Sequence, residues 1–181
     1  MRENQSLNLF VYGTLMRGFR ANAFLPEDSL VTEGRIVGNL YHYNNAGYPI
    51  IQLPKDRNSI EGTLDYDKDI AVQNEKNDTL PEYLPYHSKF GSVFGELYKI
   101  PYSNEVLGYL DTYEGFHGKP NSGLYDRTLV EVETKDFYCW AWVYNMNTLP
   151  VGVTRIYSGN WKDCFVPGGL IDTLSRFSPL R

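Results

Sequence analysis

Glu114 is the residue in this sequence whose setting most suggests chemistry, because an acidic side chain falls on the apolar face of an expected helix. The helix is expected from about residue 104 to residue 114. At about 100° per residue, Glu114 lies roughly 20° from Leu107 and roughly 40° from Leu110 around the helix axis. A carboxylate inside an apolar arc is paired, protonated or open to a cavity, since burying an unpaired charge is costly. Glu114 is therefore a candidate catalytic carboxylate.

Two other readings of this helix end stay open. Glu114 could lie at a frayed terminus and swing into solvent, or it could pair with Arg127 or Lys119. Asp111 lies at the edge of the same apolar arc, roughly 40° from Leu107. Its position favours a capping or loop-anchoring role over catalysis.

A second candidate element is the turn formed by Tyr12, Gly13, Thr14 and Leu15, which follows an apolar strand directly. Such a turn can leave successive backbone N–H groups unpaired and facing a concavity, where they can bind a carboxylate. The Thr14 hydroxyl group could add a donor. The segment lacks the G-x-x-x-x-G-K-[ST] pattern of a phosphate-binding loop. A plain turn is the alternative.

The elements that must position these residues are mostly short strands joined by turns. Apolar and alternating runs predict strands at residues 7–12, 34–43, 48–53, 92–100, 125–134 and 137–145. A weak helical stretch is expected at residues 21–25, and the helix at 104–114 has Ser103 as its N-cap and Gly115 as its stop. The pattern predicts an α+β domain built on a curved sheet or small barrel.

Residues 54–91 differ from the rest of the chain and are expected to form a polar insertion. Charged residues, Asn, Pro and Tyr dominate, and hydrophobic periodicity is poor. Residues 59–64 could form a short strand, whereas residues 65–78 are expected to be an exposed loop. A long loop in a compact domain is often a lid, a partner surface or disordered.

Composition excludes several classes of function. The 181 residues carry a net charge of −5 and no dense Lys/Arg stripe, so nucleic-acid binding is not expected. The first residues lack the apolar run of a signal peptide, and no stretch approaches the ~18 apolar residues of a membrane span. We therefore expect a cytoplasmic protein that does not enter membranes.

The cysteine and histidine residues are too scattered to suggest a metal site. Cys139 and Cys164 have no metal-ligand spacing and are expected to be reduced, partly buried thiols. His42, His87 and His117 are expected to be structural or solvated. Of these three, His117 is the best candidate for a functional role, because it follows Glu114 closely.

Seven short segments occur in an order that matches a known family: Tyr12-Gly-Thr-Leu-Met-Arg-Gly18, Tyr48-Pro49, Val93-Phe-Gly-Glu-Leu-Tyr98, Leu110-Asp-Thr-Tyr-Glu-Gly115, Tyr125-Asp-Arg127, Trp142-Val-Tyr144 and Ser158-Gly-Asn-Trp161. Together they resemble the γ-glutamylcyclotransferase-like (AIG2-like) superfamily, in particular its γ-glutamylamine cyclotransferase branch. The resemblance covers most of the chain outside residues 54–91. It implies a single domain over residues 1–181, with a small mixed β-barrel and flanking short helices.

The resemblance also implies a site. Tyr12, Gly13, Thr14 and Leu15 would bind a glutamyl or 5-oxoproline group through backbone N–H groups, and Glu114 would be the general acid/base. Tyr125 and Tyr144 match family tyrosines near the pocket, although in a chain with 15 Tyr either could simply belong to the core. No cofactor and no metal is implied.

The implied activity is release of 5-oxoproline from a γ-glutamyl amine or peptide, in which the substrate's α-amine attacks its own γ-carbonyl. The expected partner is thus a small γ-glutamyl molecule, and no protein partner is indicated. Two alternatives stay open. The first is a non-catalytic small-acid-binding or interaction protein on the same fold, with the 54–91 insertion over the pocket mouth. The second is an enzyme that acts on another amide.

Overall fold

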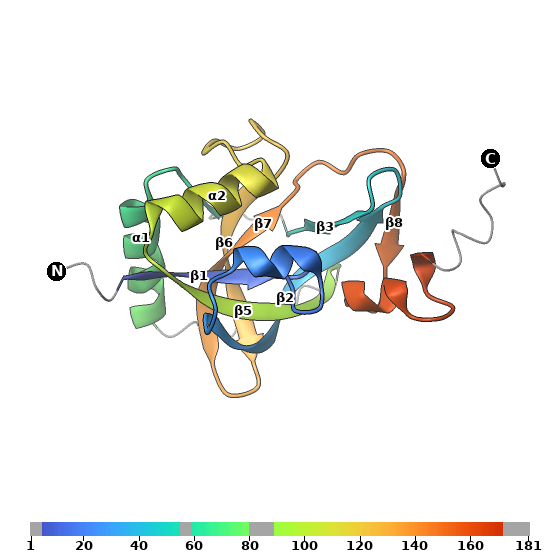
Figure 1. Cartoon of the computed structure of the whole chain (residues 1–181), viewed down its shortest axis with the longest axis horizontal. Coiled ribbons are helices and arrows are strands. Elements are labelled where there is room, and N and C mark those ends of the chain that lie inside the picture. Colours follow the sequence, from blue (N-terminus) through green and yellow to red (C-terminus); the bar gives the residue numbers. More distant parts are fainter. Residues whose placement is uncertain (1–4, 55–58, 80–88, 172–181) are drawn as a thin grey trace.

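A computed structural model of the chain describes residues 5–54, 59–79 and 89–171 (Figure 1). Its helices are α1 (Tyr66–Asp78) and α2 (Asn104–Glu114), with the short 3₁₀ helices η1 (Arg20–Phe24) and η2 (Trp161–Phe165). Its strands are β1 (Ser6–Val11), β2 (Leu30–Tyr43), β3 (Tyr48–Gln52), β4 (Ile60–Glu61), β5 (Gly91–Pro101), β6 (Asp126–Thr134), β7 (Tyr138–Asn145) and β8 (Val153–Ile156).

Five of the strands close into a mixed β-barrel. Around the ring, β1 pairs with β5, β5 with β2, β2 with β6 and β6 with β7, all antiparallel, and β7 returns to β1 through a parallel pairing. The core is apolar where these strands meet: Leu9, Val93, Val132 and Trp142 are almost completely buried. The predicted α+β barrel with short flanking helices is confirmed.

The remaining strands extend this barrel. The second half of β2 runs beyond the ring and pairs with β3 along one edge and with β8 along the other. In Figure 1, α1 and the start of β1 lie at one end of the molecule, and β8 and η2 lie at the opposite end. The short strand β8 and helix η2 were not predicted, because the Pro- and Gly-rich tail shows too little periodicity.

Helix α2 has the predicted ends. The side chain of Ser103 accepts a hydrogen bond from the Val106 N–H, and Gly115 ends the helix in the left-handed conformation with φ 66°. Glycine adopts this conformation without steric cost. The helix phase that places Glu114 beside Leu107 and Leu110 is therefore correct.

The expectation of an exposed loop at residues 65–78 is wrong, because helix α1 occupies this segment. Its buried positions are Tyr66, Asp69, Ile70 and Gln73, which have helical spacing. Two of these four are polar, so the helix carries almost no hydrophobic signal. Gln73 instead hydrogen-bonds the backbone of β1, accepting from Asn8 N and donating to Ser6 O.

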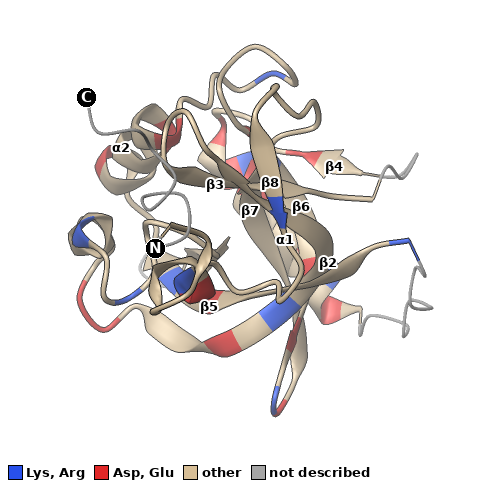
Figure 2. Ribbon diagram, turned by 90° about the vertical axis from the view of Figure 1, so that its right-hand side faces the viewer, with Lys and Arg blue, Asp and Glu red and all other residues tan. Residues whose placement is uncertain are grey.

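Charged residues of both signs are interspersed along the ribbon of β2 and β5 (Figure 2). Within the residues that the structure describes, no helix is long and apolar enough to cross a membrane.

Candidate active site

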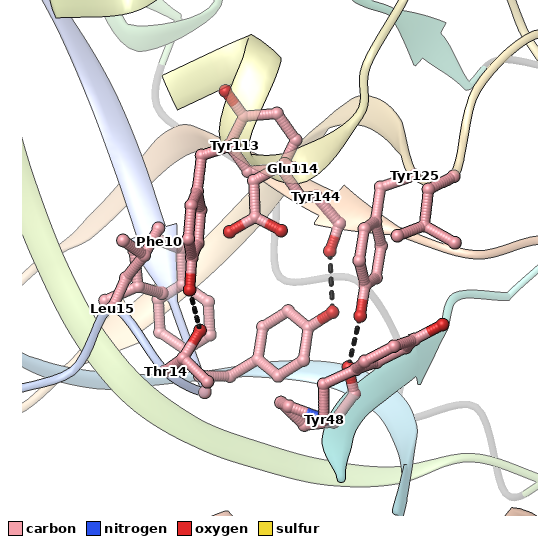
Figure 3. Close-up of a pocket in the computed structure, with 13 residues that line it drawn as sticks. Phe10, Thr14, Leu15, Tyr48, Tyr113, Glu114, Tyr125 and Tyr144 are labelled. Atoms are coloured by element: carbon pink, nitrogen blue, oxygen red, sulfur yellow. Dashed lines mark hydrogen bonds between the residues drawn. The ribbon is translucent and has the colours of Figure 1, made fainter. Parts of the chain in front are cut away.

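The pocket that contains Glu114 has a volume of about 220 Å³ and opens between the end of β1, the end of α2 and the start of β3 (Figure 3). It is lined by Phe10, Val11, Tyr12, Gly13, Thr14, Leu15, Tyr48, Pro49, Tyr113, Glu114, Leu124, Tyr125 and Tyr144. All seven predicted site residues are in this set. The structure thus brings together residues that are more than 130 positions apart in the sequence, from Tyr12 to Tyr144.

Glu114 is the last residue of α2, and its carboxylate points into the pocket (Figure 3). It forms no ion pair with Arg127 or Lys119, and no described residue donates a hydrogen bond to it. Burial, and then the charge of nearby Asp111, raise the pKa of the Glu114 carboxyl to about 8. A carboxyl group with this pKa can accept and donate a proton near neutral pH.

Gly13 is required by close packing. A β-carbon at this position would lie 2.2 Å from Cγ of Pro49, so no side chain fits. The turn closes through a hydrogen bond from Met16 N to Gly13 O. The N–H groups of Thr14 and Leu15 donate to no described residue, which leaves both available to a ligand.

The loop from Tyr12 to Gly18 is held from behind by two polar side chains. Asn22 donates from Nδ2 to Leu15 O at 2.8 Å and to the Tyr98 hydroxyl group at 2.9 Å. Buried Glu96 accepts from Arg17 N at 2.8 Å. Burial alone would raise the pKa of Glu96, but hydrogen bonds from Arg17, Tyr98 and Lys162 hold it below its usual value. Glu96 therefore stays ionised and keeps the loop in place.

Tyrosine side chains form much of the pocket wall. The Tyr12 hydroxyl group donates to Tyr144 O at 2.8 Å, and the Tyr125 hydroxyl group donates to Pro49 O at 2.5 Å. Tyr113 reaches across the opening, and its hydroxyl group lies 3.2 Å from Thr14 Oγ1 (Figure 3). Tyr125 and Tyr144 are both buried and both line the cavity, so they belong to the core and to the pocket wall at once.

The structure also reveals a buried polar network behind Glu114 that sequence reasoning only partly foresaw. Arg127 forms ion pairs with Asp111 and, at 2.7 Å, with Asp69 of α1. Asp111 additionally accepts from Tyr144 at 2.6 Å and from Tyr66 at 2.8 Å. Asp111 thus anchors α2 to the barrel strands and to α1. Asp69 and Tyr66 were missed, because their segment was interpreted as a loop.

The histidine and cysteine residues lie away from the pocket lining. His42 is buried and accepts a hydrogen bond at Nδ1 from Trp161, and the exposed His117 ring contacts Ser122 O. Cys139 and Cys164 are buried free thiols, as predicted, and burial raises the pKa of each to about 11. His87 falls outside the described residues. In the part of the chain that is described, no three His, Cys, Asp or Glu side chains are grouped to hold a metal ion.

The family model described as "Gamma-glutamyl cyclotransferase, AIG2-like" matches residues 9–73 and 71–163, and the chain belongs to this family. Comparison with curated protein sequences finds no match.

Solved structures show the same fold at low sequence identity. An AIG2-like protein from Mus musculus has a TM-score of 0.56 and 19% identity, over 91% of this chain and 93% of that one. An uncharacterized protein from Pyrococcus horikoshii has a TM-score of 0.51 and 19% identity, over 96% and 100% of the two chains. YkqA from Bacillus subtilis has a TM-score of 0.53 and 21% identity; the match covers 96% of this chain but only 43% of YkqA.

Proposed function

We propose that this protein is a cyclotransferase that releases 5-oxoproline from a γ-glutamyl amine or peptide, with Glu114 as the general acid/base. The observation that carries the proposal is the Glu114 carboxylate, which faces a tyrosine-lined pocket and has a pKa raised to about 8. Membership of the γ-glutamyl cyclotransferase family supports the same reaction class.

The glutamyl end of the substrate would bind at the loop. The N–H groups of Thr14 and Leu15 are the donors available for the substrate's α-carboxylate, and Gly13 lets the backbone approach closely. Among the described residues that line the cavity, only Glu114 carries a formal charge. The α-ammonium group of the substrate would therefore lie against Glu114, which binds the positive charge and receives its proton.

The reaction then needs no other nucleophile than the substrate's own amine. Glu114 accepts a proton from the ammonium group, and the freed amine attacks the γ-carbonyl carbon to form the C–N bond of a five-membered ring. Glu114 returns the proton to the leaving nitrogen as the old C–N bond breaks. The second proton of the attacking nitrogen leaves with the amine, so the products are a lactam and an ammonium ion.

The test is to incubate the purified protein with γ-glutamyl amines and γ-glutamyl peptides and to measure 5-oxoproline. We expect release by the native protein and a loss of at least about 100-fold in Glu114→Gln, the usual scale for removing a general acid/base. Glu105→Gln is the matched control, because Glu105 is an exposed residue at the other end of the same helix. Full activity in Glu114→Gln would disprove the assigned role.

Binding without turnover would instead favour the non-catalytic alternative. The motive for that alternative was a lid made by residues 54–91. The described part of this segment contains β4, α1 and the first residue of β5, and none of its residues lines the pocket. Turnover of amides without a γ-glutamyl group, and not of γ-glutamyl compounds, would support the other alternative.

A further inference from the structure

Asp111 and Glu114 lie one turn apart on α2. Of the two carboxylates, only that of Asp111 accepts hydrogen bonds from other described residues. The Asp111 carboxylate accepts hydrogen bonds from Arg127 of β6, Tyr144 of β7 and Tyr66 of α1. Its exposed fraction is 3%. Because no described residue donates to the Glu114 carboxylate, the direction of that carboxylate depends on how firmly the last turn of α2 is held.

Arg127 is the centre of this attachment. Its side chain is 1% exposed, and the guanidinium group donates to both Asp111 and Asp69 and also to Thr63 O at 2.6 Å. The Phe116 ring covers it, with the guanidinium carbon 4.6 Å from the ring centroid. A buried guanidinium with two carboxylate partners fixes both of them in a definite geometry.

Asp69 links helix α1 to Arg127 and, through it, to Asp111. Asp69 accepts from the Thr63 backbone N–H and hydroxyl group, both at 2.9 Å, and from Arg127 at 2.7 Å. With one arginine and two carboxylates, the group Asp69–Arg127–Asp111 keeps one negative charge in excess. The Asp111 carboxylate of this group is near enough to Glu114 to oppose ionisation of a second carboxylate.

We propose, on the basis of the proposed function, that Asp111 is a positioning residue for Glu114, and that α1 supports it through Asp69 and Arg127. This group orients the last turn of α2, and the charge of Asp111 adds to burial in opposing ionisation of Glu114. Helix α1 would then serve the active site without contacting the substrate.

The other ionisable groups around Glu114 do not supply this charge. They are Tyr12 at the end of β1, Tyr48 of β3, Tyr113 of α2, Tyr125 before β6 and Tyr144 of β7. Burial raises the pKa of Tyr12, Tyr48, Tyr125 and Tyr144, so these side chains remain neutral in the range where Glu114 titrates. Burial raises the pKa of Asp111, whereas Arg127 and the hydrogen bonds from Tyr144 and Tyr66 favour its carboxylate form. Asp111 is the acidic group whose charge acts on Glu114.

The experiment follows the titration of Glu114 itself, by carbon-13 NMR of protein labelled at the glutamate carboxyl carbon. The Glu114 signal is identified by its disappearance in Glu114→Gln. We expect the midpoint to fall by about 1 pH unit or more in Asp111→Asn, which leaves the Asp69–Arg127 pair in place. A smaller fall is expected in Asp69→Asn, and none in Glu75→Gln, an exposed residue of α1.

An unchanged midpoint in folded Asp111→Asn would overturn the proposal. If that variant does not fold, Asp69→Asn decides, because it keeps the Arg127–Asp111 pair; an unchanged midpoint there has the same meaning. Because the titration needs no substrate, it tests the role of Asp111 separately from the proposed cyclotransferase activity. A shifted midpoint without 5-oxoproline release would reject the proposed function alone, and release with an unshifted midpoint would reject the positioning role alone.

Discussion

Gly13 and Pro49 touch at the pocket wall: a β-carbon on residue 13 would lie 2.2 Å from Cγ of Pro49. Gly13→Ala must therefore push the loop away from β3 and displace the N–H groups of Thr14 and Leu15. We expect 5-oxoproline binding to weaken by at least about 10-fold, equivalent to about 1.4 kcal/mol, as measured by isothermal titration calorimetry.

The control for this change is Gly91→Ala at the start of β5, where the nearest atom would be 3.5 Å away, an ordinary contact. Binding by this variant should match that of the native protein. Equal affinity in Gly13→Ala would mean that the loop does not bind the ligand.

The pH dependence of turnover should report the ionisation of Glu114. In the proposed reaction the free enzyme must hold Glu114 as a carboxylate, so kcat/KM should rise with pH through a midpoint near the pKa of about 8. The profile is measured as the initial rate of 5-oxoproline formation at low substrate concentration. Glu105→Gln should give the same profile, whereas a midpoint below about 6 would contradict the raised pKa.

The free energy of unfolding should also depend on the ionisation of Glu114, and this contribution should fall as the pH rises. The folded-state pKa of Glu114, about 8, lies above its ordinary value of 4.5, so its protonated form favours folding below that value. This contribution is lost as the pH rises through about 8. Glu114→Gln removes the charge. At pH about 9 its free energy of unfolding, measured with urea, should exceed that of the native protein by on the order of 3 kcal/mol.

At pH about 4 the difference between Glu114→Gln and the native protein should nearly vanish, because Glu114 is then largely protonated in both the folded and the unfolded states. Glu105→Gln should show no such pH-dependent difference. A gap of equal size at both pH values would indicate a packing effect instead of a buried charge.

Arg127 should be the most important ion-pair residue for stability. Arg127→Met leaves Asp69 and Asp111 buried without their cation, which should cost about 3–5 kcal/mol in urea unfolding. Arg35→Met changes a solvent-exposed pair with Glu133 and should cost less than about 1 kcal/mol. Similar losses in the two variants would contradict the buried role of Arg127.

Asn22 should matter both for the loop and for the fold. Asn22→Ala removes the donor to Leu15 O and to the Tyr98 hydroxyl group. Because each such bond contributes about 1 kcal/mol, the free energy of unfolding should fall by up to about 2 kcal/mol, and KM should rise by about 10-fold as the loop loses its anchor. Asn74→Ala on the exposed side of α1 is the control. An unchanged KM in Asn22→Ala would show that the loop keeps its shape without this anchor.

The sequence by itself determined the features that depend on local pattern. Apolar runs placed six of the eight strands found in the described residues, and the cap at Ser103 and the glycine at residue 115 bounded α2. Because helix phase follows directly from residue spacing, it also placed Glu114 on the inner face. The order of short motifs placed Tyr12, Gly13, Thr14, Leu15, Tyr125 and Tyr144 around one pocket.

Only the tertiary structure decided which charges meet. Helix α1 was missed because its buried positions include Asp69 and Gln73, whose partners are Arg127 and the backbone of β1. Burial of a polar side chain is favourable only when a distant partner satisfies it, and no local pattern records that partner. For the same reason the sequence could not decide whether Arg127 pairs with Glu114. In the folded protein Arg127 forms an ion pair with Asp111, and Glu114 faces the pocket with no described cation beside it.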